Sequence, residues 1–375
     1  MAEMDLKKKL HQKFVIDKIS KTNWDSDFST PLVVEFDPTA VCDLACPGCI
    51  SEDIVSLGNS FSSDRLMSIG EEFIDAGIKA IVLIGGGEPL AHPKIGDFIS
   101  LVSRNDIHIG ITTNGTYIDR HIKEIAFYSK WTRVSMDAAT DNIFTVLRPT
   151  KGGKSKFNKI IKNIELLAKL KHGILGYSFL IQTEADGEGV ISNVNEIFEA
   201  AKLAKDLGCD YFEIKPTYQF RGEKPHALMK HKKKHMDDAK KQIALLDDLE
   251  TENFKILKAI NLKHSLESEN LDQPKDYKNC PSAQLRTTIT PTGVFICPYW
   301  RGKEDFLLGD MKKNSFSEVW EGNLRSKVIN SLDISKTCEE IHCLRHESNQ
   351  TAILIKKNIL KEKNIKIFEE FDRFI

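Results

Sequence analysis

The sequence predicts an α/β protein whose parallel sheet curls into a barrel or part of one. Short apolar runs alternate six times with helix-like segments between residues 31 and 222, and this alternation is typical of a parallel sheet. Each run stops at a polar or glycine-rich stretch. Right-handed crossovers bend such units in one direction. With 375 residues, 41% hydrophobic and 29% charged, the chain suffices for one large domain and a small one.

The individual elements follow from local signals along the chain. An amphipathic helical segment is expected over residues 1–30, before a first strand at 31–36 that stops at Asp37-Pro38. Two expected helices each end at a glycine, which suits the left-handed residue that follows a helix. The remaining expected elements are helices 64–76, 155–171 and 192–207, strands 80–84, 176–182 and 211–216, and two strands that end near Thr113 and Ser135.

Composition divides the chain into further predicted parts. The barrel is expected over residues 31–222. Charged helix formers dominate residues 223–275, which predicts a helical linker. A small α+β domain is expected over residues 276–350, where a Pro-Thr-Gly turn between two β-rich runs predicts a hairpin. Residues 351–375, rich in Ile, Leu, Phe and Lys, are predicted to form a closing helix.

Charge and hydropathy restrict the location and the partners. The net charge of −1 provides no broad basic surface for nucleic acid. The first twenty residues hold no apolar core long enough for a signal peptide, and no run reaches the length of a membrane span. We therefore expect a cytoplasmic protein with neither a membrane nor a nucleic-acid partner. In a reducing compartment, its eight cysteines are expected to be metal ligands or free thiols.

Three thiols, those of Cys42, Cys46 and Cys49, occur within eight residues after the first strand. A closed zinc site takes four ligands, whereas an iron–sulfur cluster can be held by thiolates alone. Three thiolates on a four-iron cluster leave one iron open, and catalysis at a metal needs an open position. A structural zinc site, or three unrelated thiols, is the alternative.

Three other strand ends carry residues able to bind a small molecule. The glycine run 85–87 lets backbone approach a ligand closely, and Glu88 adds a carboxylate. Asn114 follows the next strand, and Ser135 and Asp137 follow the one after that. Because the carboxyl ends of parallel strands meet at one edge, these loops are expected to face the cysteine loop. Ordinary turn chemistry is the alternative for the glycines and for Asn114.

The C-x3-C-x2-C spacing from Cys42 to Cys49, followed in order by Gly-Gly-Glu and Ser-x-Asp, resembles the radical S-adenosylmethionine (SAM) superfamily over residues 30 to about 220. The resemblance implies a partial (β/α)6 TIM-like barrel, a 4Fe-4S cluster on the three cysteines, and SAM as a cofactor. It further implies reductive cleavage of SAM to a 5′-deoxyadenosyl radical. The family usually has an aromatic residue before the third cysteine, where this chain has Gly48.

The same resemblance assigns roles to the strand-end loops. Gly86, Gly87 and Glu88 are expected to meet the amino group of SAM, and the Ser-x-Asp stretch is expected to meet its carboxylate or ribose. Arg148 is expected to pair with the carboxylate through a charge-assisted bond, with a surface position as the alternative. Asn114 is a further expected contact with SAM.

Four later thiols are expected to bind a second metal centre: Cys280, Cys297, Cys338 and Cys343. A hairpin with a glycine before its second cysteine, followed by a cysteine pair, resembles the short twitch form of the SPASM extension. This resemblance implies an auxiliary 4Fe-4S cluster. The last two cysteines are further apart than a tight pair, so His342 or His346 is an alternative ligand. A four-cysteine zinc ribbon is the other alternative.

The resemblance implies an enzyme that abstracts hydrogen from its substrate. The twitch form is similar to that of a dehydrogenase of 2-deoxy-scyllo-inosamine, which favours a small hydroxylated substrate (a sugar, aminosugar or nucleotide-linked compound), oxidised or epimerised with the auxiliary cluster as electron relay. Reduced flavodoxin or ferredoxin is the expected electron donor. The alternative is a SPASM enzyme that matures ribosomal peptides, which is disfavoured because no segment offers room for a peptide-recognition domain. A non-catalytic zinc-binding interaction protein is a third possibility.

Acid–base residues are sought around the sixth strand. Glu213, Lys215 and Tyr218 lie at its end or just beyond it, and each is able to take a proton. Alternation along the strand puts Glu213 and Lys215 on one face. A structural ion pair inside the barrel is the favoured alternative for these two residues.

Overall fold

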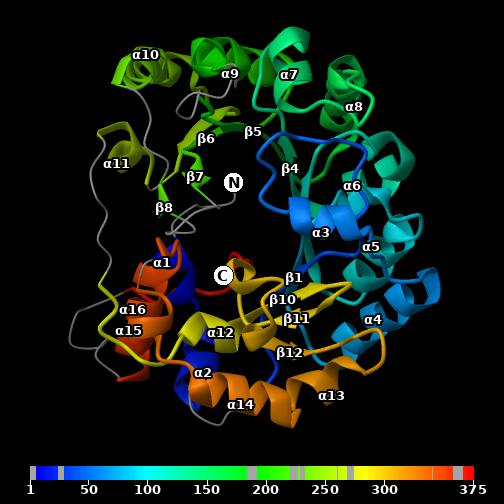
Figure 1. The fold of residues 1–375 in the computed structure, drawn as a ribbon, viewed down its shortest axis with the longest axis vertical. Helices are drawn as coiled ribbons and strands as arrows, with labels where there is room; N and C mark the ends of the chain where they lie inside the picture. The colour runs from blue at the N-terminus through cyan, green and yellow to red at the C-terminus, as the bar shows by residue number, and fades with distance from the viewer. Residues whose placement is uncertain are drawn as a thin grey trace.

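A curved ten-stranded sheet organises the chain, with its strands arranged around a central space (Figure 1). The computed structural model describes residues 6–23, 29–183, 192–219, 227–228, 233–259, 261–267, 274–339, 341–357 and 366–375. Within these residues, no helix is long and apolar enough to cross a membrane.

The strand order is β12-β11-β10-β1-β2-β3-β4-β5-β6-β9, and the eight strands from β10 to β9 run parallel. The partial β/α barrel predicted from the sequence is therefore confirmed, with β1 to β6 as its six units. The strands are β1 Val33–Phe36, β2 Ala80–Leu83, β3 His108–Thr113, β4 Ser129–Ser135, β5 Ile174–Leu180, β6 Tyr211–Lys215, β9 Lys255–Lys258, β10 Arg286–Thr290, β11 Gly293–Phe295 and β12 Leu307–Gly309. A separate antiparallel pair is formed by β7 Tyr218–Gln219 and β8 Ala227–Leu228.

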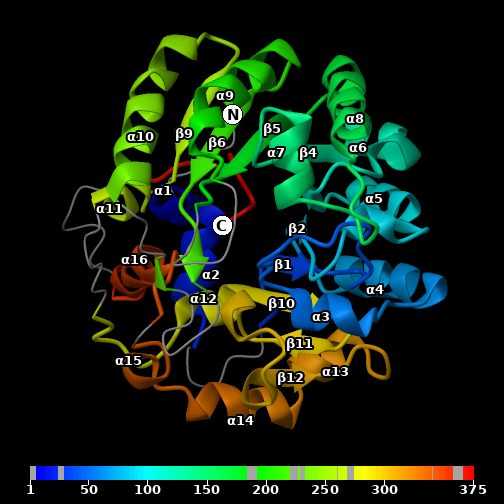
Figure 2. The same ribbon diagram turned by 45° about the horizontal axis from the view of Figure 1, so that its top comes forward.

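Helices between the strands cover the outer face of the sheet (Figures 1 and 2). Those of the barrel are α4 Ser63–Asp75, α5 Ile95–Arg104, α6 Ile122–Tyr128, α7 Asp141–Leu147, α8 Phe157–Leu170, α9 Ile197–Asp206 and α10 Lys233–Ala244. The short helix α3 Glu52–Leu57 has no buried residue and lies beside Gly86. Ser62 caps α4 by accepting from the Arg65 N–H. Gly77 and Gly208, just past α4 and α9, have φ of 73° and 82°, the left-handed conformation expected of them.

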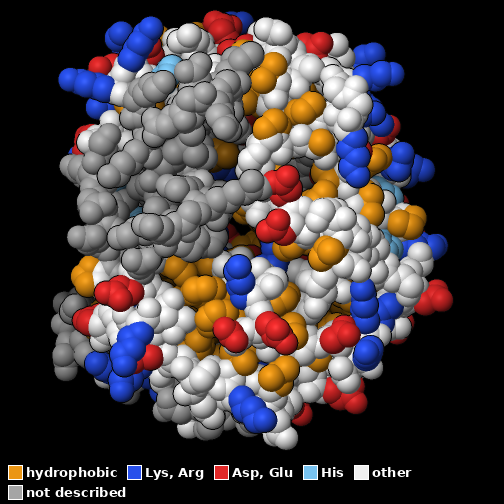
Figure 3. Space-filling view, in the orientation of Figure 1, with side chains coloured by type: hydrophobic (Ala, Val, Ile, Leu, Met, Phe, Trp, Pro, Cys, Tyr) orange, Lys and Arg blue, Asp and Glu red, His pale blue; other side chains and the backbone are white. Residues whose placement is uncertain are grey.

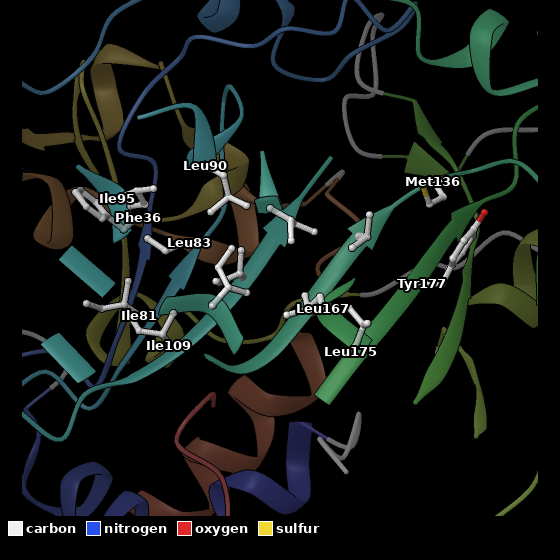
Figure 4. Close-up of a cluster of buried hydrophobic side chains, with 14 of the residues drawn as sticks. Phe36, Ile81, Leu83, Leu90, Ile95, Ile109, Met136, Leu167, Leu175 and Tyr177 are labelled. Carbon is white, nitrogen blue, oxygen red and sulfur yellow. The ribbon is translucent and has the colours of Figure 1, made fainter. Parts of the chain in front are cut away.

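The main core lies between the outer face of the strands and these helices. Alternate strand residues such as Ile81, Leu83 and Ile109 point into it, together with Leu167 of α8 (Figure 4). This alternation leaves the other strand residues facing the central space, which we call the barrel lumen. Near the carboxyl ends of β4 and β6 the lumen-facing positions are polar, whereas nearer the amino-terminal end the inner face is apolar.

The hairpin predicted from the Pro-Thr-Gly turn is present as β10 and β11, but it does not form a sheet of its own. β10 pairs in parallel with β1, from Val33↔Arg286 to Phe36↔Ile289, so the C-terminal region extends the barrel sheet. The helices of this region and those at the end of the linker are α11 Leu262–Glu267, α12 Pro281–Leu285, α13 Phe316–Trp320, α14 Asn323–Ser331 and α15 Ile334–Thr337.

The amino-terminal end of the barrel is closed by segments from both ends of the chain. Helices α1 Leu6–Leu10, α2 Lys13–Lys21 and α16 His346–Lys356 pack together there (Figure 2). Phe374 packs against Trp131 of β4, with ring centroids 5.4 Å apart. Lys9 forms a buried ion pair with Asp372 at 2.8 Å. Residues from the two ends of the chain thus fill the lumen at its amino-terminal end.

Two predictions for the second half of the chain need correction. The 223–275 linker is not wholly helical, because β9 pairs in parallel with β6; its four residues, two of them lysines, are too short and too polar to stand out as a strand. The closing helix is wrong for residues 366–375, which are not helical, and α16 ends at Lys356. Residues 358–365 and the expected boundary at 222/223 lie outside the described residues.

Phe73 joins the barrel helices to the C-terminal region. Its ring is fully buried, 5.6 Å from the centroid of Phe36 and 5.4 Å from that of Phe316. We expect Phe73→Ala to lower the free energy of unfolding by about 3–5 kcal/mol, because it removes packing and leaves a cavity. Chemical denaturation measures this. Phe127→Ala, at a ring that is 60% exposed, is the control and should cost less than about 1 kcal/mol; equal losses would contradict the packing described.

Candidate functional site

The loop from Cys42 to Cys49 follows β1 and leads into α3. Cys42, Cys46 and Cys49 are all partly exposed free thiols. The loop is held against the segment after α7, where the Ala45 N–H donates to the Pro149 carbonyl at 2.6 Å. Among the described residues, no group of three or more His, Cys, Asp or Glu side chains is close enough to hold a single metal ion.

Gly48 explains the missing aromatic residue in this loop. Its φ of 69° lies in the left-handed region, where a side chain is strained. An aromatic residue at this position would have to distort the turn between the second and third cysteines. This turn therefore contains a glycine in place of the aromatic residue that is usual in the family.

The thiols of the loop suit a cationic iron cluster. Burial raises the pKa of Cys42 to about 12, and the charges of Glu88 and Cys46 add to this effect. Burial also raises the pKa of Cys46. A thiolate at either position is unfavourable without a positive group beside it, and iron ions bound to sulfur supply that charge. The residues present thus fit a thiolate-bound cluster.

The glycine run 85–87 makes close backbone contacts beside the cysteine loop. A Cβ on Gly87 would come within 2.4 Å of the backbone of Ala40, so only glycine fits. The Gly86 N–H donates to the Asp37 carboxylate at 2.5 Å. The Glu88 N–H donates to the Val41 carbonyl at 2.9 Å. The predicted ligand loop is therefore packed directly on the chain that leads into Cys42.

Glu88 is buried and ties two strand ends together. Its carboxylate accepts from the Thr113 hydroxyl at 2.6 Å, the Asn114 N–H at 2.6 Å and the Leu90 N–H at 3.0 Å. Burial raises the pKa of Glu88 to about 7, although these hydrogen bonds oppose the rise. The carboxylate is thus already engaged within the protein, and its direct contact with the amino group of SAM stays a prediction.

Asn114 connects this network to the cysteine loop. Its side-chain amide donates to the Asp43 carboxylate at 3.0 Å and contacts the Cys42 sulfur at 3.8 Å. Its side-chain oxygen accepts from the Thr116 N–H at 2.8 Å, which is local turn chemistry. The structure thus shows Asn114 both in an ordinary turn and beside the cysteine loop. Its contact with SAM stays a prediction.

Asp137 and Arg148 lie together against the cysteine loop. The Arg148 guanidinium donates twice to one Asp137 oxygen, at 2.9 and 2.5 Å, and the other oxygen accepts from the Leu180 N–H at 2.8 Å. Burial would lower the pKa of Arg148, but the charges of Asp137 and Cys46 outweigh it and raise that pKa. Arg148 is thus largely buried beside the cysteine loop, while its pairing with the carboxylate of SAM stays a prediction.

Ser135 lies at the end of β4, partly exposed and two residues before Asp137. Asp137 itself has a left-handed φ of 58°, which is uncommon for a residue with a side chain. Such strain marks positions where the surrounding structure fixes the backbone for a purpose. The Ser-x-Asp turn therefore presents Ser135 beside a fixed Asp137–Arg148 pair.

The four later thiols lie in one neighbourhood. The charges of Cys343 and Cys338 act on Cys280, that of Cys343 acts on Cys338, and those of Cys343 and Cys280 act on Cys297. Burial raises the pKa of Cys280 to about 12 and that of Cys338 to about 11, so these thiols too need a cationic group to ionise. Because their ionised forms need a cation nearby, as those of Cys42 and Cys46 do, these thiols fit a second thiolate-bound cluster.

The two histidines offered as alternative ligands have other contacts. His346 Nδ1 hydrogen-bonds the Tyr277 hydroxyl at 3.0 Å. His342 stacks on Tyr218, with ring centroids 5.9 Å apart. Tyr218 thereby joins the segment after β6 to the neighbourhood of Cys343. Its role as an acid or base stays a prediction.

One pair of residues links the two groups of thiols and was not expected to do so. Arg301 hydrogen-bonds the Ser51 hydroxyl, two residues after Cys49. The preceding residue, Trp300, hydrogen-bonds the Cys338 thiol. The sequence did not indicate this link, because no local signal joins residues 250 positions apart.

Glu213 and Lys215 do face the barrel lumen together. Lys215 Nζ lies 3.2 Å from the Glu213 carboxylate, which also accepts from Arg133 of β4 at 3.1 and 3.3 Å. The ion pair that the sequence favoured is therefore present, and Arg133 joins it. Arg133 was missed, although it precedes Ser135 by two residues and so shares its face of β4.

Known proteins resemble this chain in sequence. Residues 36–190 match the family model described as the Radical SAM superfamily. The antilisterial bacteriocin subtilosin biosynthesis protein AlbA of Bacillus subtilis is 24% identical over 311 residues. The match covers 82% of this chain and 63% of AlbA, so this chain spans less than two thirds of that relative.

Two solved structures share the fold, including the C-terminal region. SuiB of Streptococcus suis, bound to precursor peptide SuiA, matches with a TM-score of 0.57 and 16% identity, over 81% of this chain and 67% of SuiB. Native anSMEcpe with bound AdoMet and Cp18Cys peptide matches with a TM-score of 0.55 and 16% identity, over 89% of this chain and 100% of that one. At these identities, the likeness shows the fold.

Asp37 gives the site a pH dependence. Burial raises its pKa from 3.8 to about 7, so the folded protein holds a proton there that the unfolded chain releases near pH 4. The associated stability is present below pH 4 and is lost as pH rises to about 7. An asparagine here does not titrate. We therefore expect the free energy of unfolding of Asp37→Asn to fall by about 2–4 kcal/mol less between pH 4 and pH 8 than that of the wild-type protein. Exposed Asp97→Asn should leave the profile unchanged; a profile identical in all three proteins would contradict the assignment.

Proposed function

The chain belongs to the radical SAM superfamily, and from this premise we propose that it abstracts a hydrogen atom from a residue of a peptide substrate. The observation that carries the proposal is the meeting of three strand ends at one edge. There the cysteine loop, the Gly-Gly-Glu loop and the Asp137–Arg148 pair lie in contact. In this proposal the protein uses SAM and an iron–sulfur cluster, and it needs a reductant.

The residues of this edge have separable tasks. When bound, a 4Fe-4S cluster with SAM supplies the electron that splits SAM into methionine and a 5′-deoxyadenosyl radical. Cys42, Cys46 and Cys49 would hold the cluster. The carbonyls of Gly86 and Gly87 are suited to accept hydrogen bonds from an ammonium group, and Ser135 and Arg148 are suited to donate to a carboxylate. The fixed loops would orient the cofactor.

A peptide is a better-supported substrate than the sugar-like molecule that the sequence favoured. SuiB is seen with a precursor peptide and anSMEcpe with a Cp18Cys peptide. The argument from missing room also fails, because the match spans 100% of the anSMEcpe chain. A protein matched over its whole length by this chain thus holds a peptide without any part beyond the match.

The second set of thiols is proposed to hold an auxiliary cluster. Cys280, Cys297, Cys338 and Cys343 supply four sulfurs, which leave no open iron, so this cluster would move an electron and not bind substrate. The charge of Glu35, on the inner face of β1, acts on Cys297, which supports a position of this thiol near the lumen. Reduced flavodoxin or ferredoxin is proposed as the electron donor.

Replacing Cys46 tests the radical chemistry. We expect anaerobically purified Cys46→Ala to hold about four irons where the wild-type protein holds about eight, and to lose release of 5′-deoxyadenosine under dithionite by at least about 10³-fold. The readouts are iron analysis and chromatography. Cys209→Ala, at a buried thiol outside both groups, is the matched control and should keep both properties. A colourless wild-type protein that binds zinc would refute the proposal.

A labelled peptide tests the substrate class. We expect a precursor peptide encoded near this gene, made with deuterated amino acids, to transfer deuterium to 5′-deoxyadenosine, because the abstracted atom ends on that product. Mass spectrometry of the nucleoside measures the transfer. Deuterated aminosugars are the matched comparison. Transfer from an aminosugar and none from the peptide would restore the small-molecule substrate.

A further inference from the structure

The barrel lumen contains a charge cluster, Arg133, Glu213 and Lys215, that the chemistry above does not use. Glu213 and Lys215 lie on the inward face of β6, since Phe212 and Ile214 between and beside them are fully buried in the outer core. In the sheet register Glu213 lies opposite Ser178, which lies opposite Ser135. The cluster is therefore at the level of the Ser-x-Asp turn and just below it.

Two cations in this cluster share one carboxylate. Arg133 Nη1 lies 3.1 Å and Lys215 Nζ lies 3.2 Å from the same oxygen, Glu213 Oε2. Arg133 Nη2 donates to the Thr112 hydroxyl at 3.2 Å, while its Nε is buried and has no hydrogen-bond partner among the described residues. The cluster has two cations and one carboxylate, so one positive charge is not neutralised within it.

Neighbouring carboxylates do not offset this excess charge. Asp137 acts on Lys215, but it is already paired with Arg148 at 2.5 Å. Glu35 acts on Arg133, but it is paired with Arg286 of β10. Each of these carboxylates thus carries a cation of its own. An uncompensated charge in a partly dry lumen is costly, so the arrangement is stable with a further anion.

The two cations remain accessible from the lumen although their carboxylate is buried. The Glu213 side chain is 2% exposed, whereas those of Arg133 and Lys215 are 23% and 27% exposed. Figure 3 shows a hollow near the centre of this face, with acidic and basic side chains at its rim. Glu213 therefore acts as the buried anchor that holds two cations toward the space where substrate would lie.

We propose that Lys215 and Arg133 form a subsite for a carboxylate of the peptide substrate. This inference rests on the proposed function and adds to it a preference for an acidic group near the residue that loses hydrogen. A substrate carboxylate that bridges the two cations would form one ion pair with Arg133 and one with Lys215, and so neutralise the excess positive charge. Arg133 fixes the position through Glu213 and Thr112, and Lys215, at the strand end, makes the contact nearest the cofactor site.

Binding of small amides tests the subsite. The probes are N-acetylglutamate α-amide, with a side-chain carboxylate, N-acetylglutamine, with a terminal carboxylate, and neutral N-acetylglutamine amide. They are titrated calorimetrically into the reconstituted holoenzyme saturated with SAM. We expect one acidic probe to bind at least about tenfold more tightly than the neutral one, and the preferred acid identifies the source of the carboxylate. Equal binding of all three would overturn the proposal.

Variants separate this subsite from general charge effects. Lys215→Met should reduce the preference for the acid about tenfold, and Lys215→Arg should largely restore it. Lys202→Met removes an exposed lysine paired with Asp206 on α9 and should leave the preference unchanged. If Lys215→Met does not fold, sodium acetate in excess is added to the wild-type protein and should weaken binding of the preferred acidic probe, because both carboxylates would take the same cations; binding of the acidic probe that acetate leaves unchanged would refute the subsite. Wild-type protein that releases 5′-deoxyadenosine yet shows no preference refutes only this inference, whereas protein without iron refutes the proposed function.

Discussion

The hydrogen bonds of one buried carboxylate hold the functional edge of this protein together. Glu88 leaves the end of β2 and binds Thr113 and Asn114 at the end of β3, and Asn114 in turn reaches Cys42 after β1. Three strand ends are therefore fixed to one another before any ligand is present. Because a buried, hydrogen-bonded group is expensive to leave unpaired, the loops have one low-energy arrangement, and the cysteines are presented in it.

The C-terminal region is part of the same construction. β10 pairs with β1, the strand that leads into the cysteine loop, so the second group of thiols is anchored to the sheet that anchors the first. Contacts above the sheet reinforce this: Arg65 of α4 donates to the Met311 and Asn314 carbonyls, and Arg301 binds Ser51. The two thiol groups are thereby held in one rigid frame with the lumen beside both, an arrangement suited to moving an electron away from a substrate.

Charges inside the lumen are distributed unevenly along its axis. Near the closed end, Lys9 pairs with Asp372 and Arg286 pairs with Glu35, and Arg345 lies near Glu35 as well. At the open end, Asp137 is matched by Arg148, but Glu213 serves two cations. Matched pairs stabilise an enclosed structure, whereas an excess charge is a means of recognising a partner. The lumen is therefore closed by ion pairs at its packed end, whereas at its open end two cations share one carboxylate.

The sequence by itself determined the barrel units, the cysteine loop and the order of the strand-end loops, because strand–helix alternation and short ligand spacings are local patterns. It did not reveal β9, the packing of residues 366–375 beneath the barrel, or the joining of β10 to β1, because these depend on pairing between distant segments. Likewise, the pairing of Arg148 with Asp137 and the sharing of Glu213 by Arg133 and Lys215 emerged only in three dimensions. The register of neighbouring strands, which no single segment encodes, decides which side chains meet.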